Sequence, residues 1–211
     1  MDPAAIALYR FGDQLPPEYW ADLQLREPAE VCRRSLVDYD TAGGYRITFL
    51  GEVYHCVPDA RLIFKSGASA ERLSFQDYLV LLLYLLKARE IPLSGDWVNE
   101  KELKGGALFF RGPHTLAREP LEQRYARDPS GLLQAGRMLG GTATGKGDAS
   151  FRLTALPRVP LEYIFYGADE EFPAQLIITF DRTVEEHLPL DVIWALVNIA
   201  SRKILQAGEG K

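Results

Sequence analysis

Residues 161–205 read LEYIFYGADEEFPAQLIITFDRTVEEHLPLDVIWALVNIASRKIL, and this stretch carries the strongest periodic patterns in the chain. Its two aromatic and β-branched runs, residues 161–166 and 175–180, are typical of β-strands. Between them stand Gly167, three successive acids and Pro173, which has no N–H to donate to a sheet. The pattern predicts a β-hairpin whose second strand begins near Pro173.

A long helix is predicted soon after this hairpin. Apolar residues recur at helical spacing from Ile193 to Ile204. Pro189 suits the first turn of the helix, whereas Arg202 and Lys203 suit its carboxyl end, because that end of the helix dipole is negative. The last part of the chain is therefore expected to form a strand–strand–helix unit.

The first half of the chain shows the same order of elements. Three short apolar runs predict a small meander, at residues 45–50, 53–57 and 61–65. Ser74 stands three residues before Asp77, which resembles a capping box with Asp in place of the usual Glu. Residues 75–89 are apolar around nearly the whole circumference of a helix, so this helix is expected to lie in the core.

A faint internal repeat relates these two halves. At a constant offset of 116 residues three identical pairs coincide, which are Phe49 with Phe165, Gly51 with Gly167 and Phe64 with Phe180. Common ancestry of the halves and chance coincidence both remain open. In either case each half makes a sheet with one apolar face that its own helix can cover. We therefore expect an α+β fold, a mainly antiparallel sheet with long helices packed on it, with halves at approximately residues 45–90 and 150–205.

The remaining segments complete the expected domain organisation. Residues 1–44 are expected to form short helices packed on the core, at residues 3–11, 16–23 and 30–36. Residues 45–211 are expected to form a single α+β domain. Between its halves the patterns predict a strand at residues 107–110, helices at 120–125 and 130–139, the second capped by Ser130, and a strand at 150–156.

The composition narrows the class of protein. A chain of 211 residues with 47% hydrophobic and 25% charged residues can bury a core as one domain. Its net charge of -5 and its lack of a basic patch argue against nucleic-acid binding. The longest apolar run, residues 78–86, is far shorter than the ~20 residues that span a bilayer, so no membrane contact is expected.

The cysteines and the amino terminus indicate the compartment. Cys32 and Cys56 are too few for a disulfide framework or for the four thiolates that an iron–sulfur cluster usually takes. The first residues, MDPAAIALYR, lack the long apolar core of a signal peptide. A cytoplasmic protein with free thiols is therefore expected.

The segment GGTATGKG, residues 140–147, has the spacing of a phosphate-binding loop as far as Lys146. In such a loop the glycines let backbone N–H groups approach a phosphate, and the lysine adds charge. A predicted helix rather than a strand precedes the segment, and Gly147 stands where a serine or threonine would hold magnesium. A surface loop is the favoured interpretation.

Four carboxylates form the candidate metal site. Asp169, Glu170 and Glu171 lie on the predicted turn, and Asp181 ends the second strand of the hairpin. Carboxylate oxygens of Asp169, Glu171 and Asp181 could hold magnesium or calcium. A solvated acidic turn is the competing interpretation. Asp148 and Arg158 are expected to lie near this turn.

Three further side chains are candidates for ligand contact. Arg158 or Lys146 could neutralise an anionic substrate, and Trp97 could stack on a ligand from its loop or pack in the core. With the acids of the turn, the predicted ligand-binding set is Arg158, Trp97, Asp169, Glu170 and Glu171. No metal-ligand spacing is present among the histidines, which are His55, His114 and His187.

Several uncommon motifs follow one another along the chain, namely IPLSGDWV, KELKGGALFF, LGG, ALPRVPLEYIFYGADEEFPA, ITFD and HLPLDVIWAL. From about Tyr45 to Leu205 the chain resembles the bacterial and archaeal domain-of-unknown-function family 3786, most specifically at residues 156–160 and 169–174. Members of this family tend to come from anaerobes, and some carry an attached iron–sulfur domain. The resemblance therefore implies an anaerobic redox or corrinoid-linked setting, in which any cluster would be carried by a partner protein.

Three kinds of function remain open. The first is a binding protein that takes a small molecule or a protein partner, such as an iron–sulfur protein, on residues 156–160 and 169–174. The second is a metal-dependent enzyme that uses the carboxylate cluster. The third is a structural or assembly subunit. No motif in the chain encodes a cofactor.

Overall fold

The computed structural model describes residues 15–41, 44–67 and 73–209, so the helix predicted at residues 3–11 lies outside the described part. Its helices are α2 (Pro17–Gln24), α3 (Pro28–Ser35), α4 (Phe75–Lys87), α5 (Gly106–Phe109), the 3-10 helix η2 (Gly112–His114), α6 (Glu119–Tyr125), α7 (Pro129–Met138), α8 (Val184–His187) and α9 (Leu190–Glu209). Its strands are β1 (Asp38–Asp40), β2 (Gly44–Phe49), β3 (Glu52–Val57), β4 (Leu62–Lys65), β5 (Trp97–Asn99), β6 (Thr142–Ala143), β7 (Ala149–Leu156), β8 (Val159–Tyr166) and β9 (Gln175–Asp181).

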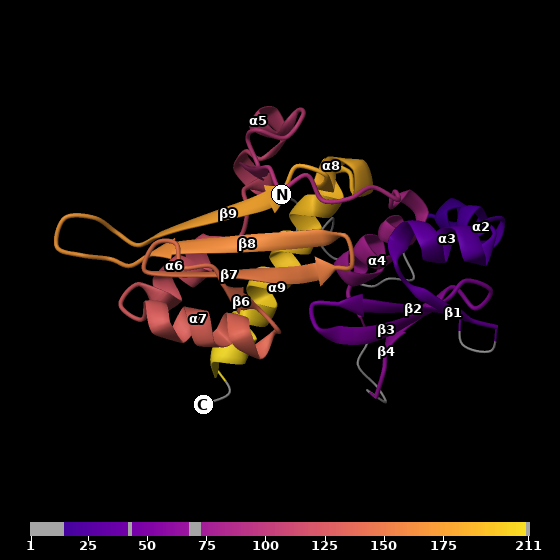
Figure 1. Cartoon of the computed structure of the whole chain (residues 1–211), viewed down its shortest axis with the longest axis horizontal. Coiled ribbons are helices and arrows are strands. Elements are labelled where there is room, and N and C mark those ends of the chain that lie inside the picture. The colour runs from indigo at the N-terminus through magenta and orange to yellow at the C-terminus, as the bar shows by residue number, and fades with distance from the viewer. Residues whose placement is uncertain (1–14, 42–43, 68–72, 210–211) are drawn as a thin grey trace.

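The strands form two antiparallel sheets rather than one. The first has the order β1-β2-β3-β4 and the second has the order β5-β9-β8-β7-β6. The α+β class and the hairpin of β8 and β9 are confirmed, with Tyr166 opposite Gln175 beside the connecting loop. The two halves do not join into one sheet, because β2 and β7 form no ladder and the Leu50 N–H meets the Ala155 carbonyl at 2.9 Å just beyond β2. The two sheets lie side by side in Figure 1.

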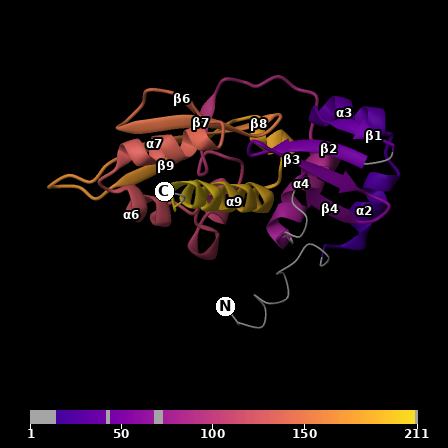
Figure 2. The same ribbon diagram turned by 90° about the horizontal axis from the view of Figure 1, so that it is seen from below.

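Among the described elements, the helices that cover the second sheet all lie on one of its sides. Figure 2 shows α7 and α9 beneath β7 and β8, and the opposite side of this sheet faces the viewer in Figure 1. Along β8 the side chains alternate, so Leu161, Tyr163 and Phe165 point into the core. A Cβ atom placed on Gly136 of α7 would lie 2.7 Å from the ring of Phe151, so only glycine allows α7 to lie this close to β7.

Helix α4 joins the two halves and begins as predicted. The Ser74 hydroxyl accepts the Asp77 N–H, while the Asp77 carboxylate accepts the Ser74 N–H at 2.9 Å. This capping box satisfies two backbone donors at the start of an otherwise apolar helix. Helix α4 packs against α9, and the buried side chains of both sheets form one continuous core.

Several local features differ from the predictions. Residues 106–109 form α5, where a strand was predicted at residues 107–110, because Gly105 has a φ of 79° and starts a helical turn. The strand β5 was not predicted, and β1 adds a strand to the segment that was expected to hold only helices. Helix α7 is capped by the Asp128 carboxylate, which accepts the Gly131 N–H at 2.8 Å, and not by Ser130.

The predicted internal repeat corresponds only partly to the arrangement of elements. Each half contains a meander followed by a long helix, β2 to β4 with α4 and β7 to β9 with α9. The offset of 116 residues places residues 53–57 of β3 opposite residues 169–173, which form a loop. Common ancestry of the halves stays a prediction. In the described ranges, no helix has both the length and the apolar character needed to cross a membrane.

Candidate functional site

The acidic turn forms the tip of the long loop between β8 and β9, which projects from the body of the protein in Figure 1. The Asp169 carboxylate accepts the N–H groups of Glu171 and Phe172 at 2.8 and 2.7 Å. These two hydrogen bonds lower the pKa of Asp169. The carboxylate therefore folds the turn, and the neighbouring acids are exposed.

Asp181 lies at the opposite end of β9, about 20 Å from the turn for a strand of this length. It is buried, and it accepts hydrogen bonds from Thr183, from Ser94 and from the Gly95 N–H. Burial alone would raise the pKa of Asp181, but these hydrogen bonds outweigh it and lower the pKa to about 2. The carboxylate holds the segment that leads into β5.

The predicted metal site is therefore wrong as a single cluster. Asp169 and Glu171 lie far from Asp181, and within the described ranges no group of three or more His, Cys, Asp and Glu side chains could hold a metal ion. The turn does line a hollow of about 690 Å³, together with Arg127, Asp148 and Glu170. The expected position of Asp148 is confirmed, since it accepts the Gly167 N–H at 2.8 Å.

Arg158 lies away from the turn, at the joint between the two halves. Its guanidinium donates to the backbone carbonyls of Arg33, Arg34 and Ile91, at 3.2, 2.6 and 3.1 Å. It therefore caps the carboxyl end of α3, and the expectation that it lies beside the acidic turn is wrong. Three of its N–H groups are committed to the protein itself.

His187 is buried close to this joint. Its Nδ1 accepts the Arg89 N–H at 3.2 Å, and in the described part of the chain its buried Nε2 has no hydrogen-bond partner. Burial, followed by the positive charge of Arg158, lowers the pKa of His187 to about 4. The imidazole is therefore neutral at physiological pH.

The open side of the second sheet carries a polar cluster built around a fully buried carboxylate. Glu162 of β8 has no exposed surface, and its Oε2 accepts the Lys146 Nζ at 2.8 Å and the Thr179 hydroxyl at 3.3 Å. The Arg152 Nη2 lies 3.6 Å from Oε1, which accepts no hydrogen bond from any described residue. Cross-strand pairing places Arg152, Glu162 and Thr179 in one row.

Trp97 completes this cluster. The Arg152 guanidinium carbon lies 4.0 Å from the centre of the Trp97 ring, in cation–π geometry. Trp97 reaches the cluster because β5 pairs with β9, and Asp181 holds the segment before it. We call Trp97, Lys146, Arg152, Glu162 and Thr179 the outer-face cluster.

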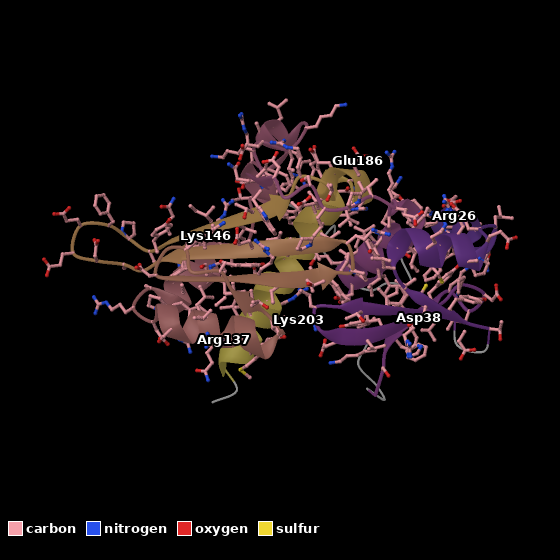
Figure 3. The ribbon with its side chains drawn as sticks, in the orientation of Figure 1. Arg26, Asp38, Arg137, Lys146, Glu186 and Lys203 are labelled. Carbon is pink, nitrogen blue, oxygen red and sulfur yellow. The ribbon has the colours of Figure 1, made fainter. Side chains whose placement is uncertain are left out.

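Lys146 enters the cluster from the glycine-rich loop between β6 and β7. The Lys146 N–H donates to the Ser150 hydroxyl at 2.7 Å, which fixes the loop against β7. Figure 3 shows Lys146 over the strands of the second sheet. A strand follows this loop, whereas a phosphate-binding loop leads into a helix, so the motif match does not describe its structure. The loop nevertheless places the Lys146 ammonium group against Glu162 on the open side of the sheet.

Three members of the cluster, Arg152, Glu162 and Thr179, were not predicted as site residues. Glu162 is the only charged residue in the run LEYIFY, and Arg152 breaks the apolar run of β7. An isolated charge in a strand with apolar neighbours on both sides indicates a charge that the fold must pair. Trp97 and Lys146 were candidates for ligand contact, and the structure brings them together.

The cluster has the positive charge and the hydrogen-bond donors that are needed to bind an anion. Two cations face one carboxylate, which leaves a local excess of one positive charge. About half of each cationic side chain is exposed, at 48% for Lys146 and 43% for Arg152. Within the described ranges the Arg152 guanidinium donates no hydrogen bond, so its N–H groups can reach a ligand.

Comparison with known proteins identifies a family but no activity. Residues 27–203 match the model of a domain of unknown function, DUF3786. No curated protein matches the chain, and no solved structure does. Because the match covers most of the chain, this protein belongs to the DUF3786 family.

Proposed function

We propose that this protein binds a small anionic ligand on the outer-face cluster of its second sheet. The observation that carries the proposal is the pairing of two half-exposed cations, Lys146 and Arg152, with the single buried carboxylate of Glu162. Burying a carboxylate is costly unless it is paired, so Glu162 fixes both cations on the sheet. The cations are thereby positioned before any ligand arrives.

Pre-positioned cations favour binding because less side-chain entropy is lost when the ligand enters. Arg152 is held between the Trp97 ring and Glu162, and Lys146 is held by its hydrogen bond to Oε2. A carboxylate or phosphate group would accept the free N–H groups of Arg152 and the remaining donors of Lys146. The half-buried indole of Trp97 offers an apolar wall beside this anion.

Titration with simple anions tests the proposal. Inorganic phosphate, sulfate and benzoate are added while tryptophan fluorescence and the melting temperature are recorded, because ligand binding changes the stacking of Arg152 on Trp97. We expect saturable binding with a Kd on the order of 0.1–1 mM for these small ions. Arg152→Gln and Lys146→Gln should each weaken binding about tenfold.

A matched control separates this site from general charge effects. Arg137 is an exposed arginine on α7 and lies on the helix side of the second sheet. Arg137→Gln removes the same charge and should leave the anion affinities unchanged. Equal losses in Arg137→Gln and Arg152→Gln, or no saturable binding of any anion, would overturn the proposal.

The setting of this binding function is also part of the proposal. The family resemblance supports an accessory role in anaerobic redox or corrinoid-linked metabolism, with an iron–sulfur protein as partner. Affinity purification of the protein from its native cells under anaerobic conditions tests this role. Recovery of an iron–sulfur protein, identified by its absorbance and iron content, is the expected result, and recovery of the chain alone would contradict it.

Assembly with another protein is the second candidate. The open side of the first sheet exposes three apolar side chains, Val53, Leu62 and Phe64. Exposed apolar side chains that gather on one face are typical of contact surfaces. Light scattering of the natively purified protein is expected to show a mass above 23.7 kDa if the chain is an assembly subunit, and a lone monomer would contradict this candidate.

A further inference from the structure

Resting on the proposed function, we infer that the ligand is a soluble amphiphile with an anionic head and an apolar body. The head binds the outer-face cluster, and the body lies along an apolar strip formed by Ile164, Ile177 and Tyr166 on the same side of the second sheet. On β8 and β9 the row that contains Glu162 lies next to the row of Ile164 and Ile177, so the head site and the apolar strip adjoin.

The register of the strands defines the strip. On β8, alternation places Ile164 and Tyr166 on the same side as Glu162. Ile164 lies opposite Ile177 of β9, and Tyr166 lies opposite Gln175. Ile164 and Ile177 are half-buried, and Tyr166 is 43% exposed. On the open side β8 therefore carries a charge at Glu162 and apolar side chains at Ile164 and Tyr166, and Gln175 borders the far end of the strip.

The dimensions of the strip set the size of the apolar body. Alternate residues of a strand are about 7 Å apart, so Ile164 lies about 7 Å and Tyr166 about 14 Å from the head position. A linear chain of medium length would reach Tyr166, and a short one would end before Ile164. Longer chains would reach the acidic turn at Asp169 and gain little more.

The distribution of charge favours a soluble amphiphile over a membrane surface. The loop beyond the strip carries Asp169, Glu170 and Glu171, which are exposed, and the whole chain has a net charge of -5. An anionic bilayer brought against the strip would meet these carboxylates, and like charges would repel it. A single molecule can place its one negative charge on Arg152 and keep its apolar end away from them.

A series of straight-chain carboxylates tests the inference. Acetate, butyrate, hexanoate, octanoate and decanoate are titrated into the full chain by calorimetry, with inorganic phosphate as the head-only probe. Complete burial of a CH₂ group tightens binding about fourfold, so a half-exposed strip should give about twofold per CH₂. We expect Kd to fall about 16-fold from butyrate to octanoate and to level off near decanoate.

Two variants connect this gain to the strip. Ile177→Thr and Ile164→Thr keep a β-branched side chain but replace a methyl-bearing carbon with a hydroxyl, so each should reduce the gain from butyrate to octanoate to about fourfold or less. Val53→Thr makes a comparable change on the open side of the first sheet and should keep the full gain. An unchanged gain in both strip variants would overturn the inference.

The outcomes separate this inference from the proposed function. If phosphate and all carboxylates fail to bind, the outer-face cluster binds no anion and both proposals are wrong. If the anions bind with a Kd that does not change with chain length, only the amphiphile inference is wrong. Binding to phosphatidylglycerol vesicles without binding to free octanoate would also overturn it, because the occupant would then be a lipid surface.

Discussion

The buried histidine at the joint makes the stability of this protein depend on pH. The pKa of His187 is about 4 in the folded state against 6.5 for the free side chain. Between these two values the unfolded chain binds a proton at His187 and the folded chain does not. The free energy of unfolding therefore falls as the pH falls through this window, and the contribution of His187 is fully present only above about pH 6.5.

The size of the effect follows from the two pKa values. One pKa unit corresponds to about 1.4 kcal/mol, so about 2.5 kcal/mol should be lost between about pH 7.5 and about pH 4.5. Burial is the largest cause of the lowered pKa of His187. The charged groups that face the imidazole also affect this pKa, and they are Arg158, Glu186, Asp181 and Arg89. Protonation would also break the hydrogen bond from the Arg89 N–H, because Nδ1 could no longer accept it.

His187→Asn isolates this contribution. The Asn side-chain oxygen can replace Nδ1 as the acceptor for Arg89, but the side chain does not titrate and leaves a small cavity. We expect the variant to be less stable than the natural protein by about 2 kcal/mol at neutral pH, and the two proteins to be about equally stable near pH 4.5. Urea unfolding followed by circular dichroism at a series of pH values measures both curves. Carboxylates titrate in both proteins and cancel in the difference, so parallel curves from pH 7.5 to 4.5 would refute the assignment.

Three further variants test which polar residues stabilise the fold and which bind the ligand. Lys146→Met should cost about 1–3 kcal/mol of stability, because it leaves a buried charge poorly paired, whereas Glu162→Gln should cost less than about 1 kcal/mol, because the two cations it leaves can be hydrated; equal losses in urea unfolding would contradict this asymmetry. Arg158→Met should cost about 3 kcal/mol through three unsatisfied carbonyls and leave phosphate affinity unchanged, so a parallel loss of affinity in calorimetry would place Arg158 in the binding site instead.

The elements with long, regular patterns could be predicted from the sequence. Helix α4 has a capping box and a continuous apolar run, and β8 and β9 consist mostly of aromatic and aliphatic residues. Short elements could not be predicted in this way. The run Ala107 to Phe110 has four apolar residues, which fit a strand or a helical turn equally well. The strand β5 has three residues and exists because β9 pairs with it.

The candidate site was predicted only in part, because register and strand length decide which side chains meet. The sequence places Asp169 and Asp181 close together on a hairpin, but a strand of seven residues separates them in space. The same register brings Arg152 from β7 and Thr179 from β9 to Glu162, although these residues are distant in the sequence. Tertiary pairing of this kind cannot be deduced from local patterns.

Hydrogen-bond saturation distinguishes the structural polar residues from those that can bind a ligand. Arg158 and Asp181 were both predicted to contact a ligand or a metal, and both have their hydrogen bonds directed to the protein itself. Such groups have few hydrogen-bonding positions left for a ligand, so their removal should reduce stability more than ligand affinity. Arg152 has the opposite character, since an aromatic ring and a long ion pair hold it while its donors remain available. We therefore propose that the buried carboxylate of Glu162, which orders the half-exposed cations Lys146 and Arg152, marks the surface on which this fold binds a ligand.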